Sequence, residues 1–135
     1  DLEVTGPVSV TLHAATSAAD TDFTAKLVDV WPDGRALCVI DGIVRARYRR
    51  SRTTPTPLTP GEVEQLTIDL WATSHVFLPG HRLRLDIASS NFPRFDRNLK
   101  TGEDPPTGTR WEVARQTIFH DARYPSHIML PVIPR

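Results

Sequence analysis

Residues 81–88, which read His-Arg-Leu-Arg-Leu-Asp-Ile-Ala, carry the pattern that decides the fold. From position 83 to position 87 an apolar side chain occupies every second place, and charged side chains occupy the places between. Alternation with a period of two is typical of a β-strand that has one buried and one solvent-facing side. A helix would space its apolar residues three and four apart, and this segment lacks that spacing. The segment therefore predicts an antiparallel strand.

Further runs with strand character extend outward from this one in both directions. In residues 8–15 and 66–72 the apolar side chains again share one face of the segment. Residues 53–61 and 91–109 are rich in proline, so we expect irregular loops there. Strands are also expected in the remaining apolar runs, at residues 23–31, 36–40, 71–78, 111–120 and 126–133.

Turn residues separate these runs at three places. Pro32-Asp33-Gly34 and Pro79-Gly80 each predict a hairpin, because glycine adopts the positive φ angle that tight turns need. Asp41-Gly42 predicts a third turn, and residues 43–50 after it read either as a strand or as a short irregular helix. About seven strands without a long helical stretch predict an all-β, mostly antiparallel β-sandwich of the jelly-roll or Greek-key kind.

Length and charge limit the organisation of the chain and its partners. A chain of 135 residues fits a single β-sandwich domain over residues 1–135, which can bury a core without a disulfide or a metal. Sixteen basic and sixteen acidic side chains give a net charge of zero, so we expect no nucleic-acid partner. No apolar run approaches the roughly 20 residues that span a bilayer, and no membrane partner is expected. The single Cys38 leaves the redox compartment open, with the cytoplasm as the favoured location.

A catalytic centre is not evident in the sequence. The nucleophile motif Gly-x-Ser-x-Gly is absent. His120-Asp121 and Ser126-His127 are close in sequence, but adjacent side chains in a strand point to opposite faces and do not assemble a triad. We therefore expect no catalytic residue in this chain.

Metal and cofactor sites are not expected either. The histidines lack the spacing of known metal motifs. His75 and His81 flank a turn and could face each other across a hairpin, but we expect exposed or capping side chains. Asp96, Glu103 and Asp104 could hold calcium, yet nearby arginines offer them neutralising partners.

Five arginines form a run in the middle of the chain, at positions 45, 47, 49, 50 and 52. In a strand, three of them would share one face and form a basic stripe. Such arginines more often pair with carboxylates of a neighbouring element. Candidate partners are Asp20, Asp22 and Asp29.

The stretch at residues 89–98, SSNFPRFDRN, contains two phenylalanines, which is unusual for an exposed loop. In one interpretation, Phe92 and Phe95 plug the open end of the sandwich, and the Asn and Arg side chains fix the backbone. In the other, the loop docks on another domain or borders a pocket. The two interpretations are compatible, and the sequence leaves both open.

At this loop the sequence resembles the C-terminal domain of the CocE/NonD serine hydrolases, the family of cocaine esterase and the X-Pro dipeptidyl-peptidases. The resemblance rests on SSNFPRFDRN with Thr101-Gly102 and on several further motifs in the family's order. These motifs are DTDFTAKLVDV (residues 20–30), PDGRA (32–36), Asp41-Gly42 with RARYR (45–49), GHRLR (80–84), ARQTIFHD (114–121) and PSHIMLPVIP (125–134).

The resemblance implies a non-catalytic jelly-roll sandwich, similar to galactose-binding folds, that packs on a preceding α/β-hydrolase domain and helps to bound the substrate cleft. The Ser, His and Asp of the family's triad lie in that catalytic domain, so none is carried over to this chain. We expect the first strand or strands of the family's sandwich to precede Asp1, which would leave a sheet edge exposed and favour a homo-oligomer. The residues expected to form the interface or to order the loop are Asp22, Phe23, Asn91, Phe92, Arg94, Arg97 and Asn98.

The alternative function is a carbohydrate-binding module of the jelly-roll type. Such modules bind sugars with exposed aromatic side chains and a few polar groups. Trp31, Trp71 and Trp111 are the candidate side chains, and fold analogy alone supports this alternative.

Overall fold

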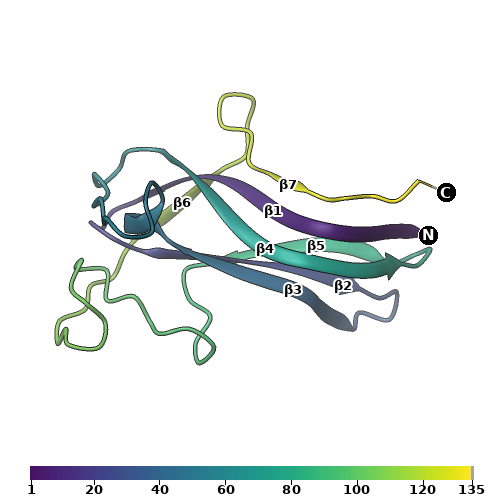
Figure 1. Cartoon of the computed structure of the whole chain (residues 1–135), viewed down its shortest axis with the longest axis horizontal. Coiled ribbons are helices and arrows are strands. Elements are labelled where there is room, and N and C mark those ends of the chain that lie inside the picture. The colour runs from purple at the N-terminus through teal and green to yellow at the C-terminus, as the bar shows by residue number, and fades with distance from the viewer. Residues whose placement is uncertain (135) are drawn as a thin grey trace.

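Two antiparallel sheets make up the fold in a computed structural model that describes residues 1–134 (Figure 1). In the first sheet, β1 (Leu2–Thr16) pairs with β4 (Glu64–Phe77) along one edge and with β6 (Gln116–Phe119) and β7 (His127–Met129) along the other. In the second sheet, β2 (Asp22–Val30) lies between β3 (Ala36–Arg45) and β5 (Arg82–Ala88). A single 3₁₀ turn, η1 (Ala46–Tyr48), follows β3. The described chain is thus all-β, and the predicted β-sandwich is confirmed.

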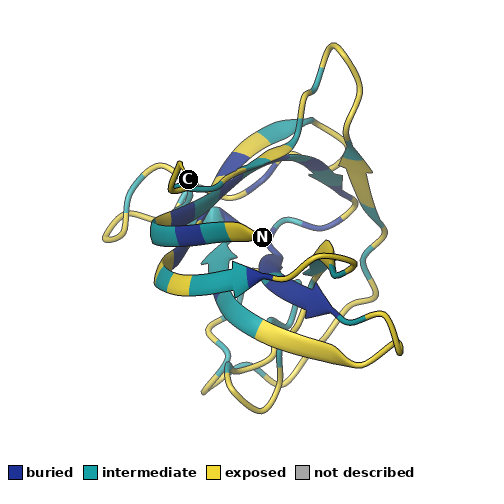
Figure 2. Ribbon diagram, turned by 90° about the vertical axis from the view of Figure 1, so that its right-hand side faces the viewer, coloured by how far each residue is buried: buried dark blue, intermediate teal, exposed yellow. Residues whose placement is uncertain are grey.

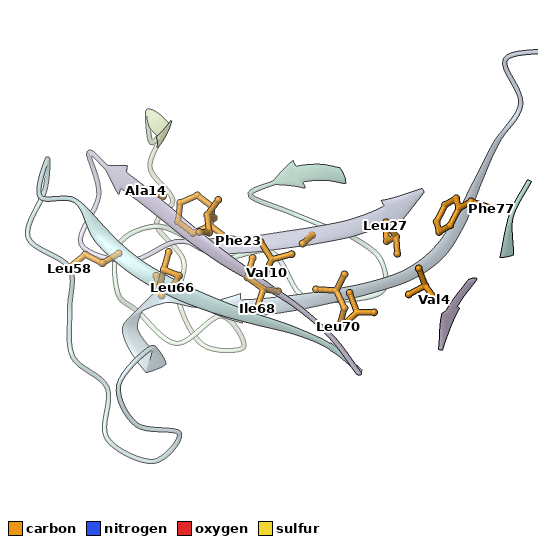
Figure 3. Packing of buried hydrophobic residues seen from close by; sticks show 14 residues of the cluster. Val4, Val10, Ala14, Phe23, Leu27, Leu58, Leu66, Ile68, Leu70 and Phe77 are labelled. Carbon is orange, nitrogen blue, oxygen red and sulfur yellow. The ribbon is translucent and has the colours of Figure 1, made fainter. Parts of the chain in front are cut away.

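The apolar faces of the two sheets meet in one core (Figure 3). The alternation predicted for residues 8–15 and 66–72 is confirmed, because each segment buries every second side chain. Figure 2 shows the buried residues between the sheets and the exposed ones along the loops. The fully buried side chains of the largest volume include Leu12, Leu27, Leu66, Ile68 and Leu70.

The two long loops and the chain ends lie at opposite ends of the sandwich (Figure 1). Residues 1–5 and 131–133 run side by side, since Thr5 N–H donates to Pro131 O and Ile133 N–H donates to Glu3 O. The loops at 46–63 and 89–115 gather at the other end, where Arg47 donates a hydrogen bond to Gly102 O at 2.7 Å. The irregular loops predicted from their prolines, at 53–61 and 91–109, lie within these two segments and lack regular secondary structure.

Two turn predictions have different outcomes. Pro32-Asp33-Gly34 joins β2 to β3 as a hairpin, with Gly34 at a φ of 89°, as predicted. The hairpin predicted at Pro79-Gly80 is wrong, because the turn connects β4 to β5, which belong to different sheets. Gly80 has the φ of 81° that a tight turn needs. Turn residues report local backbone geometry and do not reveal which strand becomes the partner.

The turn predicted at Asp41-Gly42 is also wrong, because both residues lie inside β3. Gly42 is glycine for another reason: the backbone of β4 packs directly against it. A Cβ atom at position 42 would lie 2.1 Å from the carbonyl oxygen of Asp69. The backbones of β3 and β4, which belong to different sheets, are therefore in direct contact at Gly42.

The strand lengths differ from those expected near the C-terminal end. Strands were predicted over 111–120 and 126–133, but the structure has the short β6 and β7 and an isolated bridge between Val4 and Val132. Residues 43–50 contain the end of β3 followed by η1, so each of the two interpretations describes a part. No helical segment of the described chain has the length and hydrophobicity of a membrane span.

We expect Gly42→Ala to destabilise the fold by about 3 kcal/mol, because the added methyl group meets backbone that cannot rotate away. Gly108→Ala is the matched control, since the nearest atom to its new Cβ is the movable end of the Leu99 side chain. Urea denaturation of both variants gives the comparison. Equal stability of the two variants would contradict the close approach of β3 and β4.

Candidate functional site

Two buried aspartates lie beneath the loop end of the sandwich. Asp20 and Asp22 are 2% and 1% exposed; Asp22 begins β2, and Asp20 lies two residues before it. Arg45 donates from Nε and Nη2 to the two oxygens of Asp22, at 2.9 and 3.1 Å. Arg47 donates its backbone N–H to Asp20 Oδ1 at 3.0 Å, and its side chain lies 3.6 Å from Oδ2. The predicted pairing of the arginine run with Asp20 and Asp22 is confirmed, and the hydrogen bonds to Asp22 raise the pKa of Arg45.

The long loop at 89–115 binds the same two carboxylates. Asn98 Nδ2 lies 2.9 Å from Asp20 Oδ2 and 2.8 Å from Asp22 Oδ1, and donates to both. Lys100 Nζ donates to Thr21 Oγ1 at 2.6 Å, and burial lowers the pKa of this lysine. The structure thus brings together Asp22 and Asn98, two of the residues singled out from the sequence.

A second anchor holds the start of this loop against β3. Asn91 Nδ2 donates to Asp41 Oδ2 at 2.9 Å, and Arg94 lies 3.2 Å from Asp41 Oδ1. Phe23, another of the expected residues, is 2% exposed and belongs to the core. Phe23 therefore packs in the core at the start of β2 and exposes almost no surface to a partner.

The outer side of the loop exposes large apolar side chains. Phe92 is 58% exposed, Trp111 72% and Val113 86%. The guanidinium of Arg97 lies 4.8 Å from the centre of the Phe92 ring. Phe92, Arg97 and Leu99 border a hollow of about 470 Å³, and Trp111 borders a neighbouring hollow that shares Arg97 and Leu99.

Each of the two compatible interpretations of the loop describes a part of it, because Asn91, Arg94 and Asn98 hold the loop in place, as the first one expected. Neither Phe92 nor Phe95 belongs to the core cluster, so neither plugs the sandwich. The loop borders a pocket, as the second interpretation held. The position of Trp111 at the neighbouring hollow was not predicted, because Trp111 lies beyond the SSNFPRFDRN motif.

A second cluster, which the sequence did not reveal, joins the two sheets near the chain ends. Asp29 on β2 accepts hydrogen bonds from His75 Nε2 at 3.0 Å and from His81 Nδ1 at 2.9 Å. Burial acts to raise the pKa of Asp29, but the hydrogen bonds and charges of both histidines outweigh it and hold that pKa below its usual range. The expectation that both histidines are exposed or capping side chains is wrong, because both bind the buried Asp29, which is therefore a partner of the histidines and not of the arginine run.

Three of the side chains considered as a catalytic triad at residues 120–127 have other hydrogen-bond partners. The Ser126 hydroxyl donates to Phe119 O, and His127 Nδ1 bonds to Pro125 O. Asp121 accepts from the backbone of Arg123 and Tyr124. No triad is assembled by these groups.

Two of the three acidic residues considered for calcium lie beside arginines. Glu103 accepts from Arg110 at 2.9 Å, and Asp104 lies 3.9 Å from Arg47. Within residues 1–134, no group of three or more His, Cys, Asp or Glu side chains is arranged to hold a metal ion.

The three tryptophans do not share a site. Trp31 carries the Arg35 guanidinium 4.0 Å from its ring centre. Trp71 is 76% exposed on β4, at a φ of 67° that is unusual for a bulky residue. Trp111 borders the loop pocket described above. A sugar-binding platform of several indoles is therefore not assembled.

Comparison with known proteins identifies the domain. A family model described as the X-Pro dipeptidyl-peptidase C-terminal non-catalytic domain matches residues 1–129. The chain belongs to this family. The X-Pro dipeptidyl-peptidase C-terminal domain is non-catalytic by its description. The resemblance to the C-terminal domain of the CocE/NonD hydrolases is confirmed.

Relatives of this C-terminal domain are found in larger proteins. Cocaine esterase of Rhodococcus sp. (strain MB1 Bresler) is 52% identical over 136 residues, which cover 99% of this chain and 24% of the esterase. An aminopeptidase from a marine sediment Thaumarchaeota archaeon superposes with a TM-score of 0.89 at 34% identity, over 98% of this chain and 24% of its own. An α-amino acid ester hydrolase also superposes with a TM-score of 0.89, at 35% identity and with the same coverage. The chain thus spans about a quarter of the length of these relatives.

We expect Asn98→Ala to destabilise the domain by about 2–3 kcal/mol, because two buried carboxylates each lose a hydrogen-bond donor. Asn91→Ala is the matched control on the same loop: its partner Asp41 keeps Arg94, so we expect a loss below about 1 kcal/mol. Thermal unfolding measures both. If Asn98→Ala proves as mild as the control, Asn98 does not anchor the loop.

Proposed function

We propose that this chain is the single, non-catalytic β-sandwich domain of a larger serine hydrolase that cleaves acyl esters or X-Pro peptides. In the intact protein the domain packs on an α/β-hydrolase catalytic domain and helps to bound the substrate cleft. The family match over residues 1–129 carries the proposal. The names of the longer relatives, an esterase, an aminopeptidase and an ester hydrolase, support a hydrolase as the parent protein.

The docking surface in this proposal is the outer side of the loop at 89–115. Exposed large apolar side chains are typical of surfaces that bind a protein partner. Phe92, Trp111 and Val113 are exposed on this side of the loop. Arg97 adds an exposed cation that stacks on Phe92 and has no carboxylate partner among the described salt bridges. Asp22, Asn91, Arg94 and Asn98 act as loop-ordering residues, because they fix the loop from its inner side.

The first test separates a structural domain from an enzyme. The purified chain is offered p-nitrophenyl esters and X-Pro p-nitroanilides, and we expect no turnover above that of heat-unfolded chain.

In the intact hydrolase, Trp111→Ser with Val113→Ser should lower the unfolding temperature by about 4 °C or more, because the domain interface loses its apolar contacts.

The same double substitution should leave the isolated chain unchanged, since both side chains are solvent-exposed there. Met129→Ser is the control, as Met129 is 59% exposed on β7, away from the loop. Turnover by the isolated chain would overturn the non-catalytic assignment. An unchanged unfolding temperature in the intact protein would remove the loop from the interface.

We also propose that two copies of the chain associate through the free edge of β3. Both outer strands of the second sheet pair with β2 alone. β5 carries exposed arginines, which discourage edge pairing, whereas the start of β3 exposes Leu37 at 52% together with Cys38.

Sedimentation velocity under reducing conditions should therefore show a dimer that forms with rising protein concentration. Leu37→Lys should abolish the dimer by placing a charge on the edge, and Val113→Lys on the loop should not. A monomer at every concentration would contradict this association.

A further inference from the structure

A groove lies where β3 and η1 meet the outward face of β4, away from the loop pocket. Its volume is about 640 Å³, within the range of small-molecule sites. Ile43 and Val44 of β3 and Thr67 of β4 are among its lining residues. We call it the arginine groove, after the residues that line it together with Tyr48: Arg45, Arg49, Arg50 and Arg52.

Positive charge in the arginine groove exceeds the carboxylates available to it. Arg45 is paired with Asp22 and Arg49 with Glu64. Arg50 has only a share of the same Glu64, at 3.5 Å, and its side chain is 64% exposed. Arg52 is exposed and has no ion-pair partner within residues 1–134. Two guanidinium groups are therefore left with spare charge at the mouth of the groove.

Arg49 is fixed in place and keeps one donor unused. Its Nη1 donates to Ala46 O at 3.1 Å and to Thr56 O at 2.7 Å, and its Nη2 donates to Glu64 Oε1 at 2.5 Å. The side chain is 3% exposed, yet its Nε has no hydrogen-bond partner among the described atoms. A buried N–H without an acceptor is costly, so an acceptor supplied by a ligand would be favourable.

Carboxylates, by contrast, are scarce in the groove. Asp69 is the one carboxylate in its described lining, and its Oδ1 already accepts the backbone N–H of Trp71 at 2.8 Å. A surface rich in guanidinium donors and poor in carboxylates is complementary to an oxygen-rich anion. The chain carries no net charge, so attraction is confined to this groove and does not extend over a surface as nucleic acid requires.

We propose that the arginine groove binds the oxyanion of a small organic molecule, a carboxylate or a phosphate, with Arg50 and Arg52 donating at its mouth. Arg49, whose buried Nε lacks an acceptor, lines the groove, and Ile43 offers apolar contact to the body of the ligand. This site is independent of the proposed docking surface, which lies on the loop at 89–115. Planar guanidinium groups bind both kinds of oxyanion in the same way, so the two sources differ in the ligand and not in the site.

The test uses the intact chain in two titrations, one with inorganic phosphate and one with benzoate, each at constant ionic strength set by chloride. NMR signals of the arginine Nε–H groups should shift along a saturable curve with at least one of the two probes. Saturation by phosphate but not benzoate identifies a phosphate ligand, and the reverse identifies a carboxylate.

A pair of matched variants makes the test specific to the groove. Arg50→Gln with Arg52→Gln should weaken binding about tenfold or more. Arg82→Gln with Arg84→Gln removes the same charge at the same spacing from β5 and should leave binding unchanged. Both pairs are exposed, and far-ultraviolet circular dichroism checks that the fold is retained. Linear, unsaturable shifts with both probes, or equal weakening by the two variants, would overturn the proposal.

Discussion

The loop end of this sandwich depends on the burial of two negative charges. A carboxylate removed from water must be hydrogen-bonded and paired, or its burial is prohibitively unfavourable. Asp20 and Asp22 meet this requirement with donors from three separate parts of the chain: Arg45 at the end of β3, Arg47 in η1, and Asn98 in the long loop. A loop that lacks regular secondary structure thereby gains a defined shape. The apolar side chains on its outer side are held in place by polar contacts on its inner side.

Periodicity in the sequence predicted the strands well where one face is buried. The alternation in residues 8–15 and 66–72 corresponds to the buried faces of β1 and β4, because a half-buried strand must alternate. Predictions from turn residues were less reliable. Gly42 is required by the backbone of β4, a contact between residues 27 positions apart along the chain, and Pro79-Gly80 passes between sheets. Both outcomes depend on tertiary contacts that local sequence does not encode.

The candidate site shows the same division. The SSNFPRFDRN motif and the arginine run indicated that Asn98, Asp22 and Arg45 matter, and the structure joins them. The Asp29 cluster was missed because His75 and His81 lie 46 and 52 residues from their shared acceptor. Single residues of common type, far apart in sequence, give no recognisable spacing. The exposure of Trp111 likewise follows from the course of the loop and not from its composition.

The pairing of residues 3–5 with residues 131–133 determines which part of the sandwich a pulling force would load first. Residues 3–5 run antiparallel to residues 131–133, joined by the hydrogen bonds Thr5 N–Pro131 O and Ile133 N–Glu3 O. A force that pulls these two segments apart loads their hydrogen bonds one after another, as in the opening of a zipper. The sheets near the Asp20 and Asp22 anchors lie at the far end and bear that load last. Tension from a flanking domain would therefore peel the terminal segments while leaving the anchored loop and its pocket intact.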